Sequence, residues 1–365
     1  MAEPDSKPAS KRRGYEVDAD VDAIEYYFER GVTDGLPVVP PTEARVARML
    51  AVTARPADEV IALVPPNYGA ATLEKIAVNA VMAGCKPDYL PVVVAGVQAM
   101  CAEQVSLHGV QGTTHTATPL FIVNGPVRQQ LDINCATGVF GSGWRANATI
   151  GRALRLIMTN IGGARPGEID KSTMGHPGKY TFLIGEYEEA SPWEPLHVEQ
   201  GYRPEQSTVS VYCCDAPQCI SNHGSRTAQG ILTTIGASMA VGWHHKAYLN
   251  DNCLLVIGPE HAETIGADGL SKQDVKRFLY EHMQRPLGEL LPGPDGAEGV
   301  SRQITSPERV PEGLDVQDDA TLIPKITSPD GITVVVAGGT AGRFSIHLSG
   351  WGAGSRLATA PIEFD

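Results

Sequence analysis

Two runs of apolar residues, each ending in a Gly-Pro turn, constrain the fold of this chain more than any other feature. The first run covers residues 119–123 and the second covers residues 253–257. The turns that follow them contain Gly125-Pro126 and Gly258-Pro259. A continuous apolar run of this length predicts a strand that is buried on both faces, as in the sheets of α/β proteins.

Each predicted strand also follows an apolar segment of helical length, residues 90–101 in the first copy and 230–239 in the second. The repeated order of helix, buried strand, Gly-Pro turn and short helix predicts an α/β fold of two related halves. We therefore expect an internal pseudo-repeat with the functional site in the cleft between the halves. The halves would span residues 14–200 and 201–365, after a disordered polar tail at 1–13.

Composition limits the partners of the protein. The 365 residues are 42% hydrophobic and carry a formal net charge of -13, so the chain can bury a large core but has no basic excess. This balance argues against nucleic acid and anionic membranes as partners. A small anionic substrate would need only local positive charge. An apolar, glycine-rich α/β chain also favours a homo-oligomer.

The chain is expected to be cytoplasmic. Its polar N-terminus lacks the apolar stretch of a signal peptide, and no later segment has the roughly 18 apolar residues of a membrane span. Seven cysteines, an odd number, favour reduced thiols over a disulfide framework. A long segment at 291–324, rich in Gly, Pro, Asp and Glu, predicts a surface loop.

The segment 138–197 carries the largest concentration of chemically capable side chains. Its glycine-rich turn contains Trp144 and Arg145 and leads into a helix predicted to begin near Asn147. Free backbone N–H groups at a helix N-terminus attract anions, and a guanidinium can bind a carboxylate or phosphate with two hydrogen bonds. We expect these three residues to bind an anionic substrate. The alternative is a capped helix whose Arg145 pairs with an acidic group.

The loop after this helix supplies the candidate acid–base residues. His176 and Lys179 lie on a tight turn before a strand, Glu186 follows that strand, and His197 comes shortly after it. We predict proton transfer by His176, Glu186 or His197, and stabilisation of negative charge by Lys179. A divalent metal bound by Glu186, Glu194 and His197 is an alternative, although no cofactor is assigned.

Further substrate contacts are predicted at strand ends. His115 precedes the first buried strand and Asn124 ends it. A third buried strand, 331–337, runs into a glycine-rich turn that is followed by Ser345 and His347, a position where α/β sheets place ligand-binding groups. The turn lacks the dinucleotide-binding pattern, so no nicotinamide cofactor is expected.

Cysteine chemistry is the second interpretation. Cys85 lies between glycine and lysine at the end of a predicted helix, where a neighbouring cation would favour the thiolate. Cys213, Cys214 and Cys219 form a second group, but their spacing does not match a structural zinc site. Either group could serve a thiol-dependent oxidoreductase or a sulfur-transfer enzyme.

Several segments together carry a family resemblance: DGLPVVPPT, NAVMAGCKPDYLPVV, IVNGP, RANATIGRALRLIMTNIGG and HPGKYTF followed by SPWEPLH. They cover most of the range 34–197 and resemble an uncharacterised bacterial family associated with UGSC-type (seleno)proteins. That resemblance implies no particular activity. The Cys-Gly-Ser-Cys signature of the redox members of the group is absent from the chain.

The sequence therefore predicts an enzyme, a lyase or hydrolase, that performs elimination, hydration or hydrolysis on a small anionic substrate. The thiol-dependent enzyme is the first alternative. A non-catalytic subunit of an enzyme complex is the second.

Overall fold

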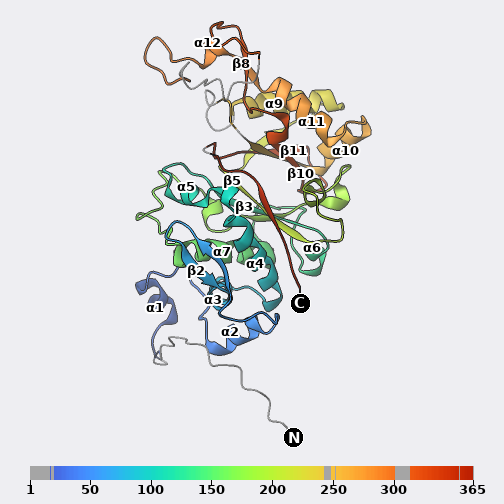
Figure 1. The fold of residues 1–365 in the computed structure, drawn as a ribbon. Helices are drawn as coiled ribbons and strands as arrows, with labels where there is room; N and C mark the ends of the chain where they lie inside the picture. The colour runs from blue at the N-terminus through green and yellow to red at the C-terminus, as the bar shows by residue number, and fades with distance from the viewer. Residues whose placement is uncertain are drawn as a thin grey trace.

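The computed structural model describes residues 17, 20–241, 248–250, 252–300, 313–352 and 354–364. The predicted tail at 1–13 lies outside these ranges. The described chain forms four layers, in which two β-sheets lie between two groups of helices (Figure 1). The protein is thus an α/β protein, as the sequence predicts.

The first sheet contains four strands in the order β12-β5-β3-β4. The strands are β3 (Thr118–Asn124), β4 (Leu183–Gly185), β5 (Thr208–Cys214) and β12 (Ala358–Pro361). β3 and β4 are parallel, whereas β5 runs antiparallel to both β3 and β12. Every residue of β3 and β5 is buried, which agrees with the predicted burial of the run at 119–123 on both faces.

Two long helices, α4 (Leu90–Met100) and α7 (Arg145–Asn160), cover the outer face of this sheet, and α3 (Leu73–Ala83) packs against both of them. The Thr72 hydroxyl caps the N-terminus of α3 by accepting a hydrogen bond from the Lys75 backbone N–H. Gly84 ends this helix with φ of 90°, a left-handed conformation that glycine adopts without a steric penalty.

The second sheet has the order β10-β7-β11-β6. It is built from β6 (Gln218–Ser221), β7 (Cys253–Ile257), β10 (Ile332–Val336) and β11 (Phe344–Ser349). β7 and β10 are parallel, and β11 is antiparallel to β6 and β7. Its outer face packs against α9 (Ala228–Val241), α10 (Pro259–Ala267) and α11 (Lys272–His282).

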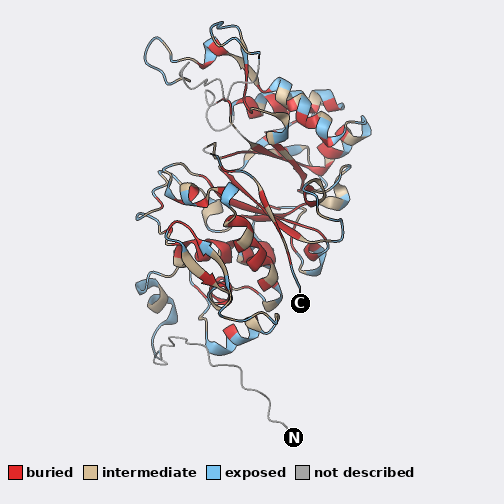
Figure 2. Ribbon diagram, viewed as in Figure 1, coloured by how far each residue is buried: buried red, intermediate tan, exposed pale blue. Residues whose placement is uncertain are grey.

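The two sheets pack face to face. Leu120, Ile122 and Tyr212 of the first sheet form one apolar cluster with Leu254 and Val256 of the second. Figure 2 shows the continuous buried band that the strands and their covering helices form. The inner faces of both sheets therefore share one core.

The chain crosses between the sheets twice. β5 belongs to the first sheet, and the next strand, β6, belongs to the second; β11 of the second sheet is followed by β12 of the first. A bridge between Cys214 and Gly350 joins the two crossings. The first sheet thus takes β5 and β12 from beyond residue 200, so the predicted boundary at 200/201 does not separate the sheets.

Shorter elements complete the described chain. They are α1 (Ala23–Glu29), α2 (Glu43–Leu50), β1 (Val60–Val64), β2 (Gly69–Thr72), α5 (Leu107–Gly112), α6 (Val127–Gln130), α8 (Leu196–Glu199), β8 (Gln284–Pro286), α12 (Leu287–Leu290) and β9 (Leu322–Pro324). Single 3-10 turns occur at Pro87–Tyr89, Glu103–Val105, Pro177–Lys179, Glu188–Ala190 and Pro329–Gly331. The described parts of the predicted loop at 291–324 include β9, which pairs with β8.

No single helix of the described chain has the length and apolarity needed to cross a membrane. One bent pair, Pro87–Met100 with Glu103–Gly112, reaches that length and composition only when both arms are counted across a 71° bend.

Candidate functional site

The predicted site residues divide between opposite ends of the first sheet. His115 lies just before β3, whereas Asn124 is its last residue. Seven strand residues at about 3.3 Å each separate the two ends by roughly 20 Å. We call one group the histidine cluster (His115, Asp170, His176, Lys179 and Asp215) and the other the carboxylate cluster (Asn124, Arg128, Glu186, Glu188 and His197).

Three separate segments build the histidine cluster. His115 comes from the segment before β3, Asp170 to Lys179 from the loop between α7 and β4, and Asp215 from the end of β5. Hydrogen bonds hold the segments together: Thr116 donates through its hydroxyl to Asp215, and Ser172 Oγ donates to the His115 carbonyl at 2.8 Å. The two histidines and Lys179 are half-buried, so the cluster lies at the protein surface.

Both imidazoles are held in one tautomer. Nδ1 of His115 accepts from the Ala117 N–H at 3.2 Å, and Nδ1 of His176 accepts from the Gly178 N–H at 3.1 Å. The proton of each neutral ring therefore lies on Nε2. Burial lowers the pKa of both rings and Lys179 lowers it further, while Asp215 acts in the opposite direction. Both imidazoles are neutral at pH 7.

Lys179 is anchored by a buried carboxylate. Its ammonium donates to both oxygens of Asp170 at 2.9 Å, and Arg155 donates to the same carboxylate at 2.7 Å. Burial acts to raise the pKa of Asp170, but the hydrogen bonds from Lys179 and Arg155 outweigh it and hold that pKa below its ordinary value. The pKa of Lys179 is itself lowered by burial. The three side chains Arg155, Lys179 and Asp170 together carry one excess positive charge, because two cations bind one carboxylate.

The carboxylate cluster is closed to solvent. Asn124, Glu186 and His197 all have 0% exposure. Oε2 of Glu186 accepts from Asn124 Nδ2 at 2.6 Å and from the Leu196 N–H at 2.8 Å, whereas its Oε1 has no partner among the described residues. Burial raises the pKa of Glu186 to about 7, against the opposing effect of Lys272.

The remaining members of the carboxylate cluster bind one another and the backbone. Glu188 accepts from the Gly125 N–H at 2.7 Å and pairs with Arg128 at 2.9 Å. Arg128 also donates to the Glu186 carbonyl at 2.7 Å. Nδ1 of His197 lies 4.0 Å from Glu188 Oε1. These contacts fix the carboxyl ends of β3 and β4, so Glu186 and His197 do not share a site with His176 and Lys179.

The predicted anion-binding residues contact the protein itself. α7 begins at Arg145, two residues before the predicted start, and Trp144 precedes it. Arg145 donates twice to the Gly84 carbonyl, at 3.1 and 2.9 Å, and so caps the C-terminus of α3. Asn147 is buried. Its Oδ1 accepts a hydrogen bond from the Asn134 N–H at 2.8 Å, and its Nδ2 donates one to the Asn134 carbonyl at 2.9 Å. The expected anion site is therefore replaced by contacts that join α3, α7 and the strand ends.

The buried cysteines of the two predicted groups do not resemble nucleophiles. Cys85 is buried, its thiol donates to the Thr149 carbonyl at 3.3 Å, and burial raises its pKa to about 12. Cys213 and Cys214 are buried as well, with raised pKa values. Cys219 is exposed. A buried thiol with a raised pKa is a packing residue, because the thiolate is the reactive form.

Ser345 and His347 lie on β11, and His347 is near enough to Asp215 of the histidine cluster for that carboxylate to act on its pKa. The Ser345 hydroxyl lies 2.9 Å from Nδ1 of His261, on α10. His347 is buried, and burial followed by Lys325 lowers its pKa to about 3. His347 is enclosed in the core of the second sheet, whereas Ser345, although buried, lines the small cavity beside the glycine-rich turn.

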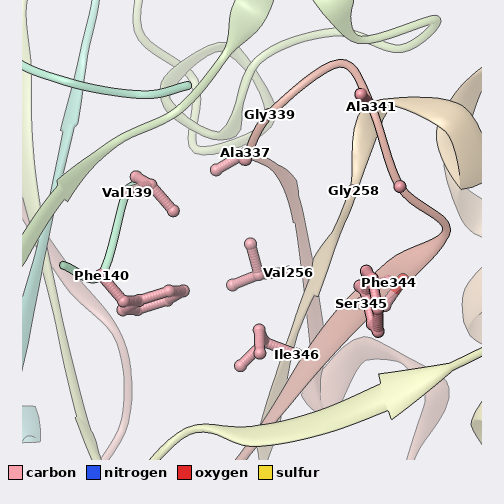
Figure 3. A pocket seen from close by; sticks show the side chains of 12 residues that line it. Val139, Phe140, Val256, Gly258, Ala337, Gly339, Ala341, Phe344, Ser345 and Ile346 are labelled. Atoms are coloured by element: carbon pink, nitrogen blue, oxygen red, sulfur yellow. The ribbon is translucent and has the colours of Figure 1, made fainter. Parts of the chain in front are cut away.

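A small apolar cavity lies beside the glycine-rich turn at 337–342. It encloses about 130 Å³ between Phe140, the turn, and the strands β7 and β11 (Figure 3). The ring of Phe140 packs against Phe182 at 6.1 Å, and Phe182 packs against His176 at 5.5 Å. The aromatic row thus connects the cavity wall with the histidine cluster.

Sequence reasoning missed Arg155, Asp170 and Asp215. Two signals could have identified them: Arg155 occupies the apolar stripe of a predicted helix, and Asp215 follows a buried strand directly. Within the described ranges, no group of three or more His, Cys, Asp or Glu side chains has the arrangement of a metal site. Glu186, Glu194 and His197 therefore form no such group.

Comparison with known proteins adds no relative from which an activity can be transferred. No protein-family model matches the chain, and no curated protein matches it.

Proposed function

We propose that the protein is an enzyme that transfers protons to or from a small anionic substrate at the histidine cluster. Elimination, hydration and hydrolysis are the reactions that such groups serve, so we assign it as a lyase or hydrolase. The observation that carries the proposal is the convergence of two neutral imidazoles, a lysine and two carboxylates from three chain segments at one half-buried place.

Lys179 is the cation of the cluster that an anion could reach. Arg155 and Lys179 share one carboxylate, Asp170, and Asp215 supplies a second negative charge near the two imidazoles. The Lys179 side chain is 16% exposed, so its ammonium can also reach a ligand. The Arg155 side chain is only 6% exposed and binds Asp170 from the interior of the protein. Lys179 is therefore assigned to substrate binding and to stabilisation of developing negative charge.

The imidazoles are assigned to proton transfer. Nε2 of His176 carries the ring proton, is buried, and is directed at the backbone carbonyl of Cys214, which acts to raise the pKa of the ring against the larger effect of burial. An imidazole with a lowered pKa loses an added proton readily at neutral pH, which suits a group that both accepts and donates protons.

The position of the cluster also fits a site between two related halves. In each sheet a strand followed by a Gly-Pro turn pairs in parallel with one neighbour and antiparallel with the other. The edge strand of each sheet follows a strand of the other sheet in the chain. We infer an internal repeat from this correspondence. Asp215 lies at the first crossing, where the halves meet.

The test is a search for turnover with matched variants. The purified protein is incubated with a pool of small carboxylic acids and phosphate esters, and the pool is followed by mass spectrometry. We expect at least one anion to be consumed by the wild type and spared by His176→Gln and by Lys179→Met. His108→Gln and Lys171→Met, two exposed residues outside the cluster's contacts, serve as controls and should keep full activity.

Consumption that persists in both His176→Gln and Lys179→Met would refute this site. Activity lost on alkylation, with ligand protection, would favour the thiol-dependent alternative. Tight association with a partner protein and no turnover by the chain alone would favour a non-catalytic subunit.

A further inference from the structure

Lys179 shares its counter-charge with a second cation that stays protonated at every accessible pH. Arg155 donates to Asp170 Oδ2 at 2.7 Å and to Gln111 Oε1 at 3.0 Å, and its side chain is only 6% exposed. This ion pair is complete without Lys179. Asp170 therefore keeps a buried partner when the Lys179 ammonium becomes a neutral amine, and the side chains of Arg155, Asp170 and Lys179 then carry no net charge.

The surroundings of Lys179 favour that neutral amine. Burial lowers the pKa of Lys179, Asp170 acts in the opposite direction, and Arg155 lowers it further. A lysine that is partly removed from water beside another cation is suited to act as a nucleophile, because only the unprotonated nitrogen has a free electron pair. A lysine that served only as a fixed positive charge would be better placed beside a carboxylate of its own.

The turn that carries Lys179 also brings an imidazole near the amine. Lys179 ends the 3-10 turn Pro177–Lys179, and its backbone N–H donates to the His176 carbonyl at 2.9 Å. Nδ1 of the His176 ring accepts from the Gly178 N–H at 3.1 Å, so the same turn fixes the orientation of the ring. Burial lowers the pKa of His176 and of His115, and the charge of Lys179 lowers both further. The amine and the two imidazoles therefore lie within interaction range of one another.

We propose that Lys179 forms an imine with its substrate, and that the small anion of the proposed function is therefore an oxo acid, a carboxylate that also carries a ketone or aldehyde group. The proposal rests on the proposed function for the place of the reaction, and it adds a covalent bond. Lys179 is the amine of the histidine cluster, and its side chain is 16% exposed, so the carbonyl carbon of a small substrate can approach the nitrogen.

The step balances without a further reactant, because an ammonium and a carbonyl compound give a protonated imine and one water molecule. An imidazole of the cluster takes one proton from the Lys179 ammonium, and the free amine bonds to the carbonyl carbon while the C=O electron pair moves to the oxygen. A second proton passes from the nitrogen to that oxygen. The proton held by the imidazole completes the water, which leaves as the C=N bond forms.

The protonated imine has the same charge as the ammonium that it replaces, so the charge that faces Asp170 is unchanged. Its positive nitrogen draws electrons from the neighbouring carbons of the substrate. A proton or a carboxyl group on the adjacent carbon is then lost more readily. The imine would in this way serve the elimination that the proposed function assigns to the site.

Sodium cyanoborohydride tests the proposal, because it reduces a protonated imine to a stable secondary amine. The full-length protein is incubated at pH 7 with the reductant and with glyoxylate, pyruvate or acetoacetate, and peptide mass spectrometry locates the adduct. We expect at least one of these oxo acids to become attached to Lys179 at least about tenfold faster than to the exposed Lys171, because the site holds the carbonyl against the amine. Lys171→Met should leave the adduct on Lys179 unchanged.

Lys179→Arg is the matched variant, because it keeps a cation facing Asp170 but its guanidinium does not form an imine under these conditions. We expect its urea midpoint to stay close to that of the wild type, while the turnover found in the pool of anions is lost. No adduct on Lys179 with any of the three oxo acids, or turnover that persists in Lys179→Arg, would overturn the imine and leave proton transfer at the cluster intact. Turnover retained in both His176→Gln and Lys179→Met would instead refute the proposed function.

Discussion

Replacement of Glu186 by glutamine tests the most unusual electrostatic feature of the structure. Glu186 is completely buried, and its Oε2 accepts hydrogen bonds from Asn124 and from the Leu196 backbone. The glutamine side chain has nearly the same shape, and its amide oxygen can accept both hydrogen bonds. Glu186→Gln therefore removes the titration of this position while it preserves the packing.

The magnitude follows from the pKa of the carboxyl. Burial raises it from 4.5 to about 7 in the folded protein, a difference of roughly 2.5 pH units. Between these values the folded state binds more protons than the unfolded state, so the free energy of unfolding decreases as the pH rises. At about 1.4 kcal/mol per pH unit, the wild type loses roughly 3 kcal/mol between pH 4.5 and pH 8 because of this one group. The glutamine variant loses none of it.

Urea unfolding of both proteins between pH 4.5 and pH 8 measures the difference. Other titrating groups are common to both chains and largely cancel. We expect the free energy of unfolding of Glu186→Gln to rise relative to the wild type by about 3 kcal/mol over this range. Glu189→Gln is the control that should stay nearly constant over this range, because hydrogen bonding to Arg128 lowers the pKa of Glu189 and places its titration mostly below pH 4.5. A difference between Glu186→Gln and wild type that is constant with pH would refute the reasoning.

Three further substitutions or modifications test the other assignments. Iodoacetamide at pH 8 should label exposed Cys219 much faster than buried Cys85, whose pKa of about 12 leaves almost no thiolate, as peptide mass spectrometry will measure. Asp170→Asn should lower the free energy of unfolding by about 3–5 kcal/mol, because it leaves Arg155 and Lys179 without their buried counter-charge; equal urea midpoints would contradict this. Asn147→Ala should lower the free energy of unfolding by about 2–3 kcal/mol, because its hydrogen bonds to the backbone are lost. It should not alter the substrate affinity measured by titration. A loss of substrate binding would instead indicate that Asn147 belongs to an anion site.

The elements with strong local signals could be predicted from the sequence. The buried strand at 253–257 has the predicted bounds, and the apolar helix predicted at 90–101 spans Leu90–Met100, since continuous apolar runs are properties of neighbouring residues. The edge strand β12 was not predicted. Its four residues pair with β5, roughly 150 positions earlier in the chain, and only the tertiary structure brings those segments together.

The candidate site was predictable in its residues but not in its grouping. His176, Lys179 and Glu186 are close in the sequence, and we expected them to act together. A strand, however, separates its ends by about 3.3 Å per residue, so residues before and after it cannot share a site. β4 lies between Lys179 and Glu186, as β3 lies between His115 and Asn124. The grouping of His115 with His176, and of Asn124 with Glu186, also depends on the parallel pairing of β3 with β4, which only the tertiary structure shows.

The crossing of the chain between the sheets connects the histidine cluster, the proposed site, with both sheets. Asp215 follows β5 at the point where the chain leaves the first sheet, and its backbone N–H donates to the Ser349 carbonyl at the end of β11. The Asp215 carboxylate accepts a hydrogen bond from the hydroxyl of Thr116, next to His115. A ligand that displaces the His115 or Asp215 side chain would therefore affect both sheets at once. Glu186, in contrast, is enclosed on all sides and can contribute to stability without contact with solvent.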